Sequence, residues 1–421
     1  MDDRYLAFKI LSKIEYDKAY SNLAVDSILN KYEATSSAFV CALVYGVLER
    51  KLTLDYYLSR FLSQSIKKLN PQVLTILRMG VYQLKFMDKV PVSAAVNESV
   101  KLSRKIKCSF ASGLVNSVLR KVSSTNISLP DTKDEIYDLS ISYSCPENLV
   151  SQFVKDYGLD FAEKILSSSV GSVPTYIRVN TLKITSDELC KKLFDEGIIA
   201  EVCKEHPEAL EILSGKSIFK SKCYKKGYFH AQDLASQKCV EFFAPEKGDT
   251  VFDMCAAPGG KTFTMAEIME NCGDIYSFDL YDHKIKLIND GTERLGITIV
   301  NATIGDASVY NPDLPRADKI LCDVPCAGLG VIRRKPEIKY KDFSFVDKLC
   351  ELQYNILNNA SLYLKDKGVI MYSTCSLSKR ENQDVCNRFL ETHKDFKNGG
   401  MVTIEPNTAS DGFFYAKLIK E

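Results

Sequence analysis

Residues 251–262, V-F-D-M-C-A-A-P-G-G-K-T, decide the fold of this chain. An apolar run ends at Asp253, a turn with one proline and two glycines follows at 258–260, and Lys261 opens a segment with a helical pattern. Glycines let the backbone approach a ligand closely, and the free N–H groups of a helix N-terminus attract an anionic group. The stretch predicts the first strand, turn and helix of a nucleotide-binding α/β fold, although a tight connection that binds nothing has the same pattern.

Strands and helices alternate from Phe242 to the end of the chain, which is typical of a doubly wound, Rossmann-like sheet. Two further apolar segments close the sequence, M-V-T-I-E-P at 401–406 and G-F-F-Y-A-K-L-I at 412–419, and a polar loop separates them. They predict an antiparallel hairpin at one edge of the sheet. The main strands are predicted at 250–254, 274–279, 298–303, 318–323 and 368–374.

Acidic residues close the second and third predicted strands, where ligands of such sheets bind. Asp279 lies about 20 residues after Gly260, the spacing at which an acid contacts ribose hydroxyls. Asp306 follows the third strand in I-G-D-A, where a carboxylate can accept a hydrogen bond from an adenine amino group. We interpret both as ligand contacts; the alternative for each is a helix cap.

Two cysteines follow the next two strands. Cys326 ends the sequence D-V-P-C that begins at Asp323, and Cys375 lies in S-T-C-S. A cysteine inside a strand is usually inert packing, but these two lie just past their strands among Pro, Gly, Thr and Ser. Because neighbouring strand ends meet in one crevice, we expect the two thiols to lie close together.

A ribose-adenine ligand, an acid and two thiols suit methyl transfer to carbon 5 of cytosine. That carbon is a poor nucleophile until a thiolate adds to carbon 6 of the ring. A free thiol has a pKa of about 8.5, so the site must stabilise the thiolate. Asp323 can hydrogen-bond the pyrimidine, and the second cysteine can assist when the first is expelled. The target base must leave its stack to reach such a site.

The composition is that of an ordinary globular protein of two or three domains, with 421 residues, 45% hydrophobic and 26% charged. No apolar run has the length of a membrane span, and the N-terminus lacks the pattern of a signal peptide. The 14 cysteines include no C-x-x-C pair. We therefore expect a cytoplasmic monomer with reduced thiols and with neither a membrane nor a metal partner.

Charge is concentrated in the first part of the chain. Residues 1–125 hold 19 Lys+Arg and 10 Asp+Glu, whereas the whole chain has a net charge of only +1. Apolar spacing predicts helices throughout this part, and the stretch 99–122 has six basic residues and no acidic one. A basic helical bundle indicates a polyanionic partner such as RNA, or else a solvated surface. The candidate phosphate contacts are Lys101, Arg104, Lys105 and Lys107.

The chain divides into four predicted regions. A polar segment with Pro130, followed by a return to a helical pattern at 136–170, suggests a linker and helical connector at 126–170. A small α/β subdomain follows, in which Arg178 is a candidate RNA contact or simply an exposed strand residue. Arg333 and Arg334, after the Cys326 loop, are candidates of the same kind, with solvation as the alternative. The regions are the helical domain 1–125, the connector 126–170, the RNA-contacting subdomain 171–235 and the catalytic domain 236–421.

Several motifs together resemble the RNA 5-methylcytosine methyltransferases: D-M-C-A-A-P-G-G-K-T, F-D-L, G-D-A, D-V-P-C-A-G-L-G and S-T-C-S-L-S-K-R-E-N. V-P-V-S-A-A-V-N-E-S-V and G-L-V-N-S-V-L-R-K-V resemble the helical RNA-binding domain of the antitermination factor NusB. The NusB-like N-terminal region narrows the resemblance to those RNA 5-methylcytosine methyltransferases that act on small-subunit ribosomal RNA. The middle region is similar to a small RRM-like fold.

The resemblance implies S-adenosylmethionine as the cofactor and small-subunit ribosomal RNA as the partner. It implies that Asp279 binds the ribose and Asp306 the adenine side, that Asp323 lies beside the methyl donor and the base, that Cys375 is the nucleophile and that Cys326 assists product release. Ala327 departs from the serine usual in the family. The residues implied to line the cofactor are Cys255, Ala256, Ala257, Pro258, Gly259, Gly260, Lys261, Asp279, Asp306 and Asp323.

Three other functions are weighed against this hypothesis. Residues 255–262 approach a P-loop, but Cys255 replaces its first glycine and Pro258 lacks an N–H for phosphate. An RNA-binding assembly factor with an idle methyltransferase domain would not need the two cysteines. A cysteine protease needs a histidine near its thiol, and none of the four histidines lies at a predicted strand end beside Cys326 or Cys375.

Overall fold

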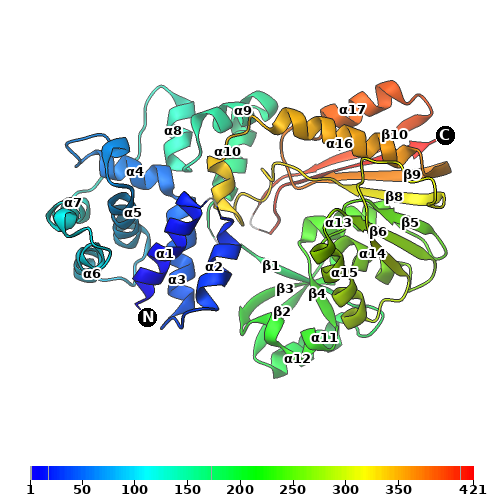
Figure 1. Cartoon of the computed structure of the whole chain (residues 1–421), viewed down its shortest axis with the longest axis horizontal. Helices are drawn as coiled ribbons and strands as arrows, with labels where there is room; N and C mark the ends of the chain where they lie inside the picture. Colours follow the sequence, from blue (N-terminus) through cyan, green and yellow to red (C-terminus); the bar gives the residue numbers. More distant parts are fainter. Residues whose placement is uncertain (1, 18, 172, 408) are drawn as a thin grey trace. The chain divides into compact units, whose positions relative to one another are not determined.

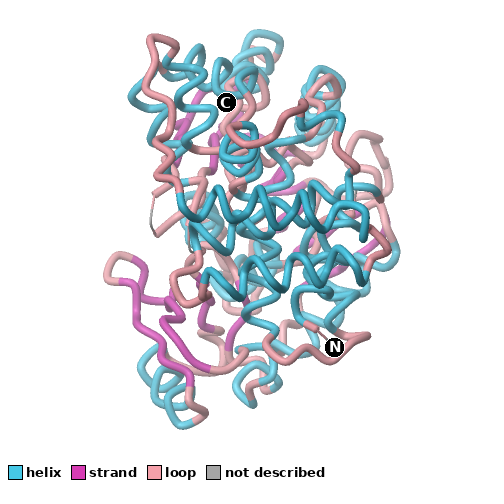
Figure 2. Tube along the Cα trace, turned by 90° about the vertical axis from the view of Figure 1, so that its left-hand side faces the viewer, coloured by secondary structure: helices cyan, strands magenta, loops and turns pink. Residues whose placement is uncertain are grey.

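The computed structural model describes residues 2–17, 19–171, 173–407 and 409–421, so Met1, Lys18, Ser172 and Thr408 lie outside the described residues. The chain forms two compact units: Met1–Gly171 with Ile332–Lys341, and Ser172–Val331 with Asp342–Glu421. Every strand that the structure describes belongs to the second unit (Figures 1 and 2). The four predicted domain boundaries remain predictions. Within the described ranges, no helix is long and apolar enough to cross a membrane.

The first unit is helical, as the apolar spacing predicted. Pro71 occupies the first turn of its helix, and the side chain of Asn70 caps that turn by accepting the N–H groups of Gln72 and Val73. The helices are α1 (Asp3–Tyr16), α2 (Ser21–Leu29), α3 (Ser37–Glu49), α4 (Lys51–Ser59), α5 (Pro71–Phe86), α6 (Val92–Lys105), α7 (Ser112–Ser124), α8 (Glu135–Ser142), α9 (Glu147–Tyr157) and α10 (Leu159–Ser168), with short 3-10 turns η1 (Ile66–Lys68) and η2 (Ser109–Ala111).

A segment from the catalytic half of the sequence completes the helical unit. Residues 332–341, with the 3-10 turn η4 (Pro336–Tyr340), belong to it although they follow the Cys326 loop. Glu337 accepts both the N–H and the hydroxyl of Ser21 at 3.0 Å. Lys339 is buried and donates to the carbonyls of Glu49 at 2.9 Å and Tyr143 at 3.2 Å. Burial lowers the pKa of Lys339 to about 8.

The middle region forms a four-stranded antiparallel sheet in the order β2-β3-β1-β4. Its α11 begins with a capping box between Thr185 and Glu188. Ile177 and Val179 of β1 pack towards Leu189 of α11. The elements are β1 (Thr175–Val179), α11 (Ser186–Asp195), β2 (Ile198–Cys203), β3 (His206–Gly215), η3 (Ile218–Lys220), α12 (Lys222–Lys225) and β4 (Phe229–Ala231).

The catalytic half forms a seven-stranded sheet in the order β10-β11-β9-β8-β5-β6-β7. Five neighbouring strands are parallel: β9, β8, β5, β6 and β7. The C-terminal hairpin adds β11 and β10 antiparallel at one edge of the sheet, as predicted. The last parallel strand starts four residues before its predicted start at 368. The strands are β5 (Thr250–Asp253), β6 (Asp274–Asp279), β7 (Val300–Ile304), β8 (Ala317–Asp323), β9 (Leu364–Thr374), β10 (Phe396–Ile404) and β11 (Phe413–Lys420).

Helices cover both faces of this sheet because alternate strand residues are apolar on each side. Leu321 and Met371 face the cluster that contains α13, α14 and α15, while Ile320 and Ile370 face the cluster that contains α16 and α17. The sheet is therefore the doubly wound core that the alternation of strands and helices predicted. The helices are α13 (Leu234–Phe243), α14 (Gly260–Ile268), α15 (Asp282–Leu295), α16 (Val346–Ser361) and α17 (Gln383–Thr392).

Candidate active site

The turn between β5 and α14 brings the backbone close to open space at the strand ends. Gly259 has a φ of 107°, and a Cβ there would lie 2.4 Å from the ring of Phe263, so only glycine fits. Gly260 starts α14, whose first N–H groups have no acceptor within the helix. The turn therefore presents unpaired donors where the sequence predicted an anionic group.

Two cavities flank this turn. The first, about 200 Å³, has Asp253 and Asp323 in its wall together with six of the seven turn residues predicted to line the cofactor. These are Cys255, Ala256, Ala257, Pro258, Gly260 and Lys261. Gly259 shapes the turn and is not in the wall. The second cavity, about 260 Å³, is lined by the apolar side chains of Phe278, Val309 and Tyr310 and by Asp306.

The two acids that follow β6 and β7 have different surroundings. Asp279 is buried at the end of β6, where its carboxylate accepts the N–H of Tyr281 and the ammonium of Lys284, both at 3.3 Å. Asp306 is exposed beside the second cavity and accepts the N–H and hydroxyl of Ser308 at 2.9 and 2.7 Å. Neither is the residue that precedes a helix, so the simple capping alternative does not describe them.

Asp323 and Lys261 form an ion pair in the wall of the first cavity. Lys261 Nζ lies 2.6 Å from Asp323 Oδ2, and the Ser373 hydroxyl donates to Oδ1 at 2.7 Å. Burial acts to lower the pKa of Lys261, but attraction by Asp323 outweighs it and the pKa is raised. The lysine is thus a fixed cation that is already paired with a carboxylate. A P-loop lysine must instead be directed to phosphate, which disfavours that alternative.

Asp253 behaves differently from Asp323. It is buried, its Oδ2 accepts the Thr262 hydroxyl at 2.7 Å, and its Oδ1 has no hydrogen-bond partner among the described residues. Burial raises its pKa to about 7, a shift that the hydrogen bond from Thr262 only partly offsets. The carboxylate therefore has an unused acceptor in the cavity wall.

The structure brings the two predicted thiols together. Cys326 Sγ and Cys375 Sγ lie 3.0 Å apart, the two do not form a disulfide, and both are half-buried. The hydrogen bond with Cys375 and burial raise the pKa of Cys326 well above its ordinary value. The raised pKa favours the protonated thiol of Cys326 over its thiolate, and a protonated thiol suits a proton donor.

One buried carboxylate, absent from the predicted site, holds both cysteine loops. Glu381 Oε1 accepts the N–H of Ala327 at 2.8 Å, and its Oε2 accepts the Ser376 hydroxyl. Gln353 supports the same carboxylate at 3.1 Å and also donates to the carbonyl of Pro325. The signal available in the sequence was the R-E-N end of the motif after Cys375. The N–H of Ala327 makes this contact without needing a hydroxyl at that position.

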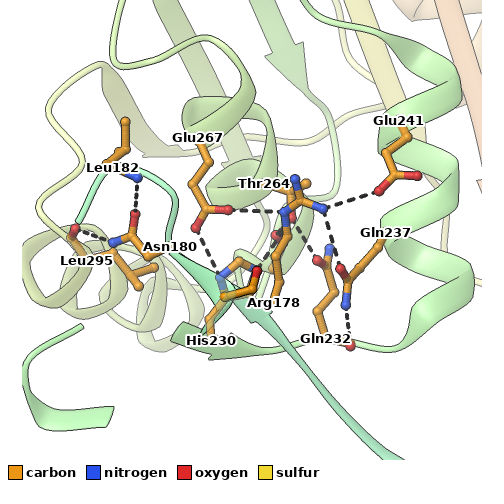
Figure 3. A network of polar contacts seen from close by, with 12 residues as sticks. Arg178, Asn180, Leu182, His230, Gln232, Gln237, Glu241, Thr264, Glu267 and Leu295 are labelled. Carbon is orange, nitrogen blue, oxygen red and sulfur yellow. Dashed lines mark hydrogen bonds and ion pairs between the residues drawn. The ribbon is translucent and has the colours of Figure 1, made fainter. Parts of the chain in front are cut away.

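Two candidate RNA contacts are corrected by the structure. Arg178 is only 3% exposed, and its guanidinium pairs with Glu267 at 3.1 Å and Glu241 at 3.4 Å (Figure 3). Arg333 is 8% exposed within the helical unit. Both side chains are enclosed by protein and are not surface cations. Arg334 is half-buried, whereas Lys101, Arg104, Lys105 and Lys107 are exposed at the end of α6 and just after it.

Three family descriptions match successive parts of the chain. The NusB family matches residues 1–124, the ferredoxin-like domain of RsmF/B-like methyltransferases matches 145–218, and 16S rRNA methyltransferase RsmB/F matches 240–419. A Bacillus subtilis protein named probable ribosomal RNA small subunit methyltransferase B is 35% identical over 94% of this chain and 89% of its own length. A Synechocystis protein of the same name is 31% identical over 99% of each chain.

The chain belongs to the 16S rRNA methyltransferase RsmB/F family. Its fold of helical, ferredoxin-like and methyltransferase parts confirms the predicted fold class. The crystal structure of PH0851 is similar over 99% of this chain and 98% of that one, with 26% identity and a TM-score of 0.82. NSun6 from Pyrococcus horikoshii, solved with SFG, covers 65% of this chain and 98% of its own, with 25% identity and a TM-score of 0.60.

The cofactor of this RsmB/F-family chain is S-adenosylmethionine, of which SFG is an analogue. The residues at the strand ends fit such a molecule. The apolar second cavity suits an adenine ring, the buried Asp279 suits ribose hydroxyls, and the polar first cavity suits the amino-acid end. Among the described residues, no group of three His, Cys, Asp or Glu side chains is arranged to hold a metal ion.

Proposed function

We propose that the protein methylates carbon 5 of a cytosine in small-subunit ribosomal RNA, through a covalent bond between Cys375 and carbon 6 of the base. The names of the relatives support a ribosomal RNA substrate. The observation that carries the choice of carbon 5 is the pair of thiols 3.0 Å apart, in the loops that follow β8 and β9. Asp323, at the end of β8, lines the cofactor cavity. Methylation of an exocyclic amine or a ribose hydroxyl would need no thiol.

The cofactor supplies an electrophilic methyl group at this site. Cys375, as the thiolate, adds to carbon 6 of cytosine, and carbon 5 becomes nucleophilic. Asp323 accepts a hydrogen bond from the pyrimidine edge, and the Lys261 ammonium and Ser373 hydroxyl fix its orientation. After carbon 5 has gained the methyl group, a water molecule accepts the proton from carbon 5, the double bond between carbons 5 and 6 forms again, and the carbon–sulfur bond breaks. Cys326 lies within hydrogen-bond distance of the departing sulfur and can return a proton to it.

The target cytosine must be unpaired or flipped out, because the thiols lie at strand ends and are half-buried. The exposed basic residues around the end of α6 are proposed as phosphate contacts that hold the RNA without reading its sequence. These are Lys101, Arg104, Lys105 and Lys107.

The proposal is tested by incubating the purified protein with unmodified small-subunit ribosomal RNA and methyl-labelled S-adenosylmethionine. We expect label in RNA, recovered after digestion as 5-methylcytidine. Label in another nucleoside would overturn the choice of carbon 5, and RNA binding without any label would favour an assembly factor. Large-subunit ribosomal RNA serves as the control and should remain unlabelled.

A further inference from the structure

The connection from β3 to β4 carries a concentrated positive charge. Residues 212–232, I-L-S-G-K-S-I-F-K-S-K-C-Y-K-K-G-Y-F-H-A-Q, contain five lysines and no acidic residue, whereas residues 201–211 contain four glutamates and one lysine. We call residues 216–226 the lysine-rich segment. It includes η3 and α12, which lies beside α11 in the small α/β subdomain (Figure 1). Its lysines are Lys216, Lys220, Lys222, Lys225 and Lys226.

The charge of the lysine-rich segment is not neutralised by nearby carboxylates. All five lysines are exposed, and none forms an ion pair with another residue that the structure describes. Glu196 contacts the segment, but its carboxylate accepts the backbone N–H groups of Lys222 at 2.7 Å and Cys223 at 3.1 Å. Exposed ammonium groups without partners attract a polyanion.

An exposed aromatic ring lies among these lysines. Phe219 is 54% exposed and directly precedes Lys220. Its ring meets the ring of Tyr224 edge-on, with 5.4 Å between the centroids, and the Arg294 guanidinium lies 4.0 Å from the centroid of Tyr224. The ring of Phe219 is thus supported from one side and open to solvent on the other. In sites for single-stranded RNA, such rings stack on bases.

The lysine-rich segment is fixed to the methyltransferase part of the same unit. Arg294, at the end of α15, donates to the carbonyls of Tyr224 at 3.0 Å and Phe229 at 2.9 Å. A Cβ on Gly227 would lie 1.9 Å from the carbonyl oxygen of Arg294, so the two backbones are in close contact. The segment and the two thiols belong to one compact unit. RNA that binds the segment is therefore held relative to the thiols.

The segment does not lie where the target base must enter. α15 begins just after β6, at the carboxyl ends of the parallel strands, and the segment contacts its other end. A helix of 14 residues is about 21 Å long. RNA bound by the lysine-rich segment is consequently a different stretch from the one that contains the methylated cytosine.

RNA fits this surface better than an acidic protein does. A protein interface has a core of several apolar or aromatic side chains. Within residues 214–227, all of which the structure describes, Phe219 is the only large apolar side chain that is exposed. A single ring among lysines instead matches one base with the phosphates on either side of it.

We propose that the lysine-rich segment binds a single-stranded stretch of the substrate RNA remote from the target cytosine, with one base stacked on Phe219 and phosphates bound by the lysines. Phosphate contacts position RNA without reading its sequence, so the segment contributes affinity. The proposal rests on a ribosomal RNA substrate but not on which nucleotide or carbon is methylated.

The lysines are tested by filter binding of the full-length protein to unmodified small-subunit ribosomal RNA over a range of salt concentrations. We expect Lys216→Gln/Lys220→Gln to reduce the slope of log affinity against log salt by about 1.4, since each phosphate contact to a single strand contributes about 0.7. Lys286→Gln/Lys394→Gln removes two exposed lysines elsewhere in the unit and should keep the parent slope. An unchanged slope in the first variant, or the same reduction in both, would overturn the proposal.

Phe219 is tested in the same assay. Phe219→Ala should weaken RNA binding roughly tenfold, on the scale of one stacked base, and leave the salt slope as in the parent. Phe219→Trp should restore the affinity because it presents a planar ring, whereas Phe219→Leu should not. Equal affinity of the leucine and tryptophan variants would show an apolar contact without stacking and would overturn the proposal. Calorimetry with S-adenosylhomocysteine shows that each variant is folded.

The two proposals fail in different ways. RNA that binds with the expected losses in these variants but gains no methyl label would contradict the proposed methylation and leave the RNA-binding role of the segment intact. Label in 5-methylcytidine together with parent-like RNA binding by all four segment variants would contradict only the role of the segment.

Discussion

The Cys326 and Cys375 loops begin alike and continue differently. Each follows one of two neighbouring parallel strands, and Glu381 holds the residue after each cysteine. The Cys375 loop continues to α17 within the same unit, whereas the Cys326 loop runs into residues 332–341 of the helical unit. The hydrogen bond with Cys375 and burial also raise the pKa of Cys326. Two similar sequence positions can therefore have separate tasks.

Replacement of the nucleophile should have the largest effect. Cys375→Ala removes the only atom proposed to bond the base, so methyl transfer should fall by at least about 10³-fold, on the scale seen when covalent catalysts lose their nucleophile. Labelled methyl incorporation measures it, with calorimetry confirming that cofactor binding persists. A covalent RNA adduct formed by this variant would reverse the roles of the two thiols.

Cys326→Ala should also stop turnover, but at a later step. Without a proton for the departing sulfur, the Cys375 adduct should accumulate and appear as a shifted band on a denaturing gel. The double variant Cys326→Ala/Cys375→Ala is the matched control and should form no adduct. If Cys326→Ala turns over normally, the division of tasks between the loops is wrong.

Glu381→Gln tests the carboxylate that contacts both the Cys326 loop and the Cys375 loop. The neutral amide cannot accept from Ala327 and Ser376 as a carboxylate does, so kcat should fall about ten- to hundredfold through small misplacement of both thiols. The affinity for S-adenosylhomocysteine should not change. Glu391→Gln, on the exposed side of α17, is the control and should behave as the parent protein. Loss of only one thiol's function would show that Glu381 supports a single loop.

Lys339 lies in the segment where the Cys326 loop enters the helical unit. Its replacement should have the smallest effect of the variants described here. Its pKa of about 8 lies below the ordinary 10.5, so the unfolded chain binds more protons between these values and the free energy of unfolding rises with pH there. Lys339→Met lacks this contribution. From pH 8 to 10.5 its stability should therefore fall relative to the parent by about 1–3 kcal/mol, measured by urea unfolding. The exposed Lys335→Met should track the parent throughout.

The sequence predicted the strands and what lies at their ends, because parallel strands all present their carboxyl ends to one edge. That rule was enough to place Asp279 at the buried end of β6 and Asp323 at a cavity wall, and to bring Cys326 beside Cys375. It required only the strand order along the chain and no knowledge of side-chain contacts.

Residues whose roles depend on distant partners were not predictable. Glu381 contacts Ala327, 54 positions away, through a backbone N–H that has no sequence pattern. Arg178 and Arg333 were expected at the surface because arginine usually is, but both are buried, and Arg178 pairs with carboxylates from α13 and α14. The charge of a residue in the sequence therefore shows neither whether its side chain is exposed nor which group it pairs with.

Because residues 332–341 belong to the helical unit, the backbone passes between the two units at three places, near 171, 331 and 341. The N-terminal module is consequently not a detachable fusion. An engineered fragment beginning at 173 would keep a ten-residue peptide whose natural surroundings had been deleted, with Ile332, Ile338 and Lys339 newly in water. The peptide that follows Cys326 therefore depends on the N-terminal module for its surroundings.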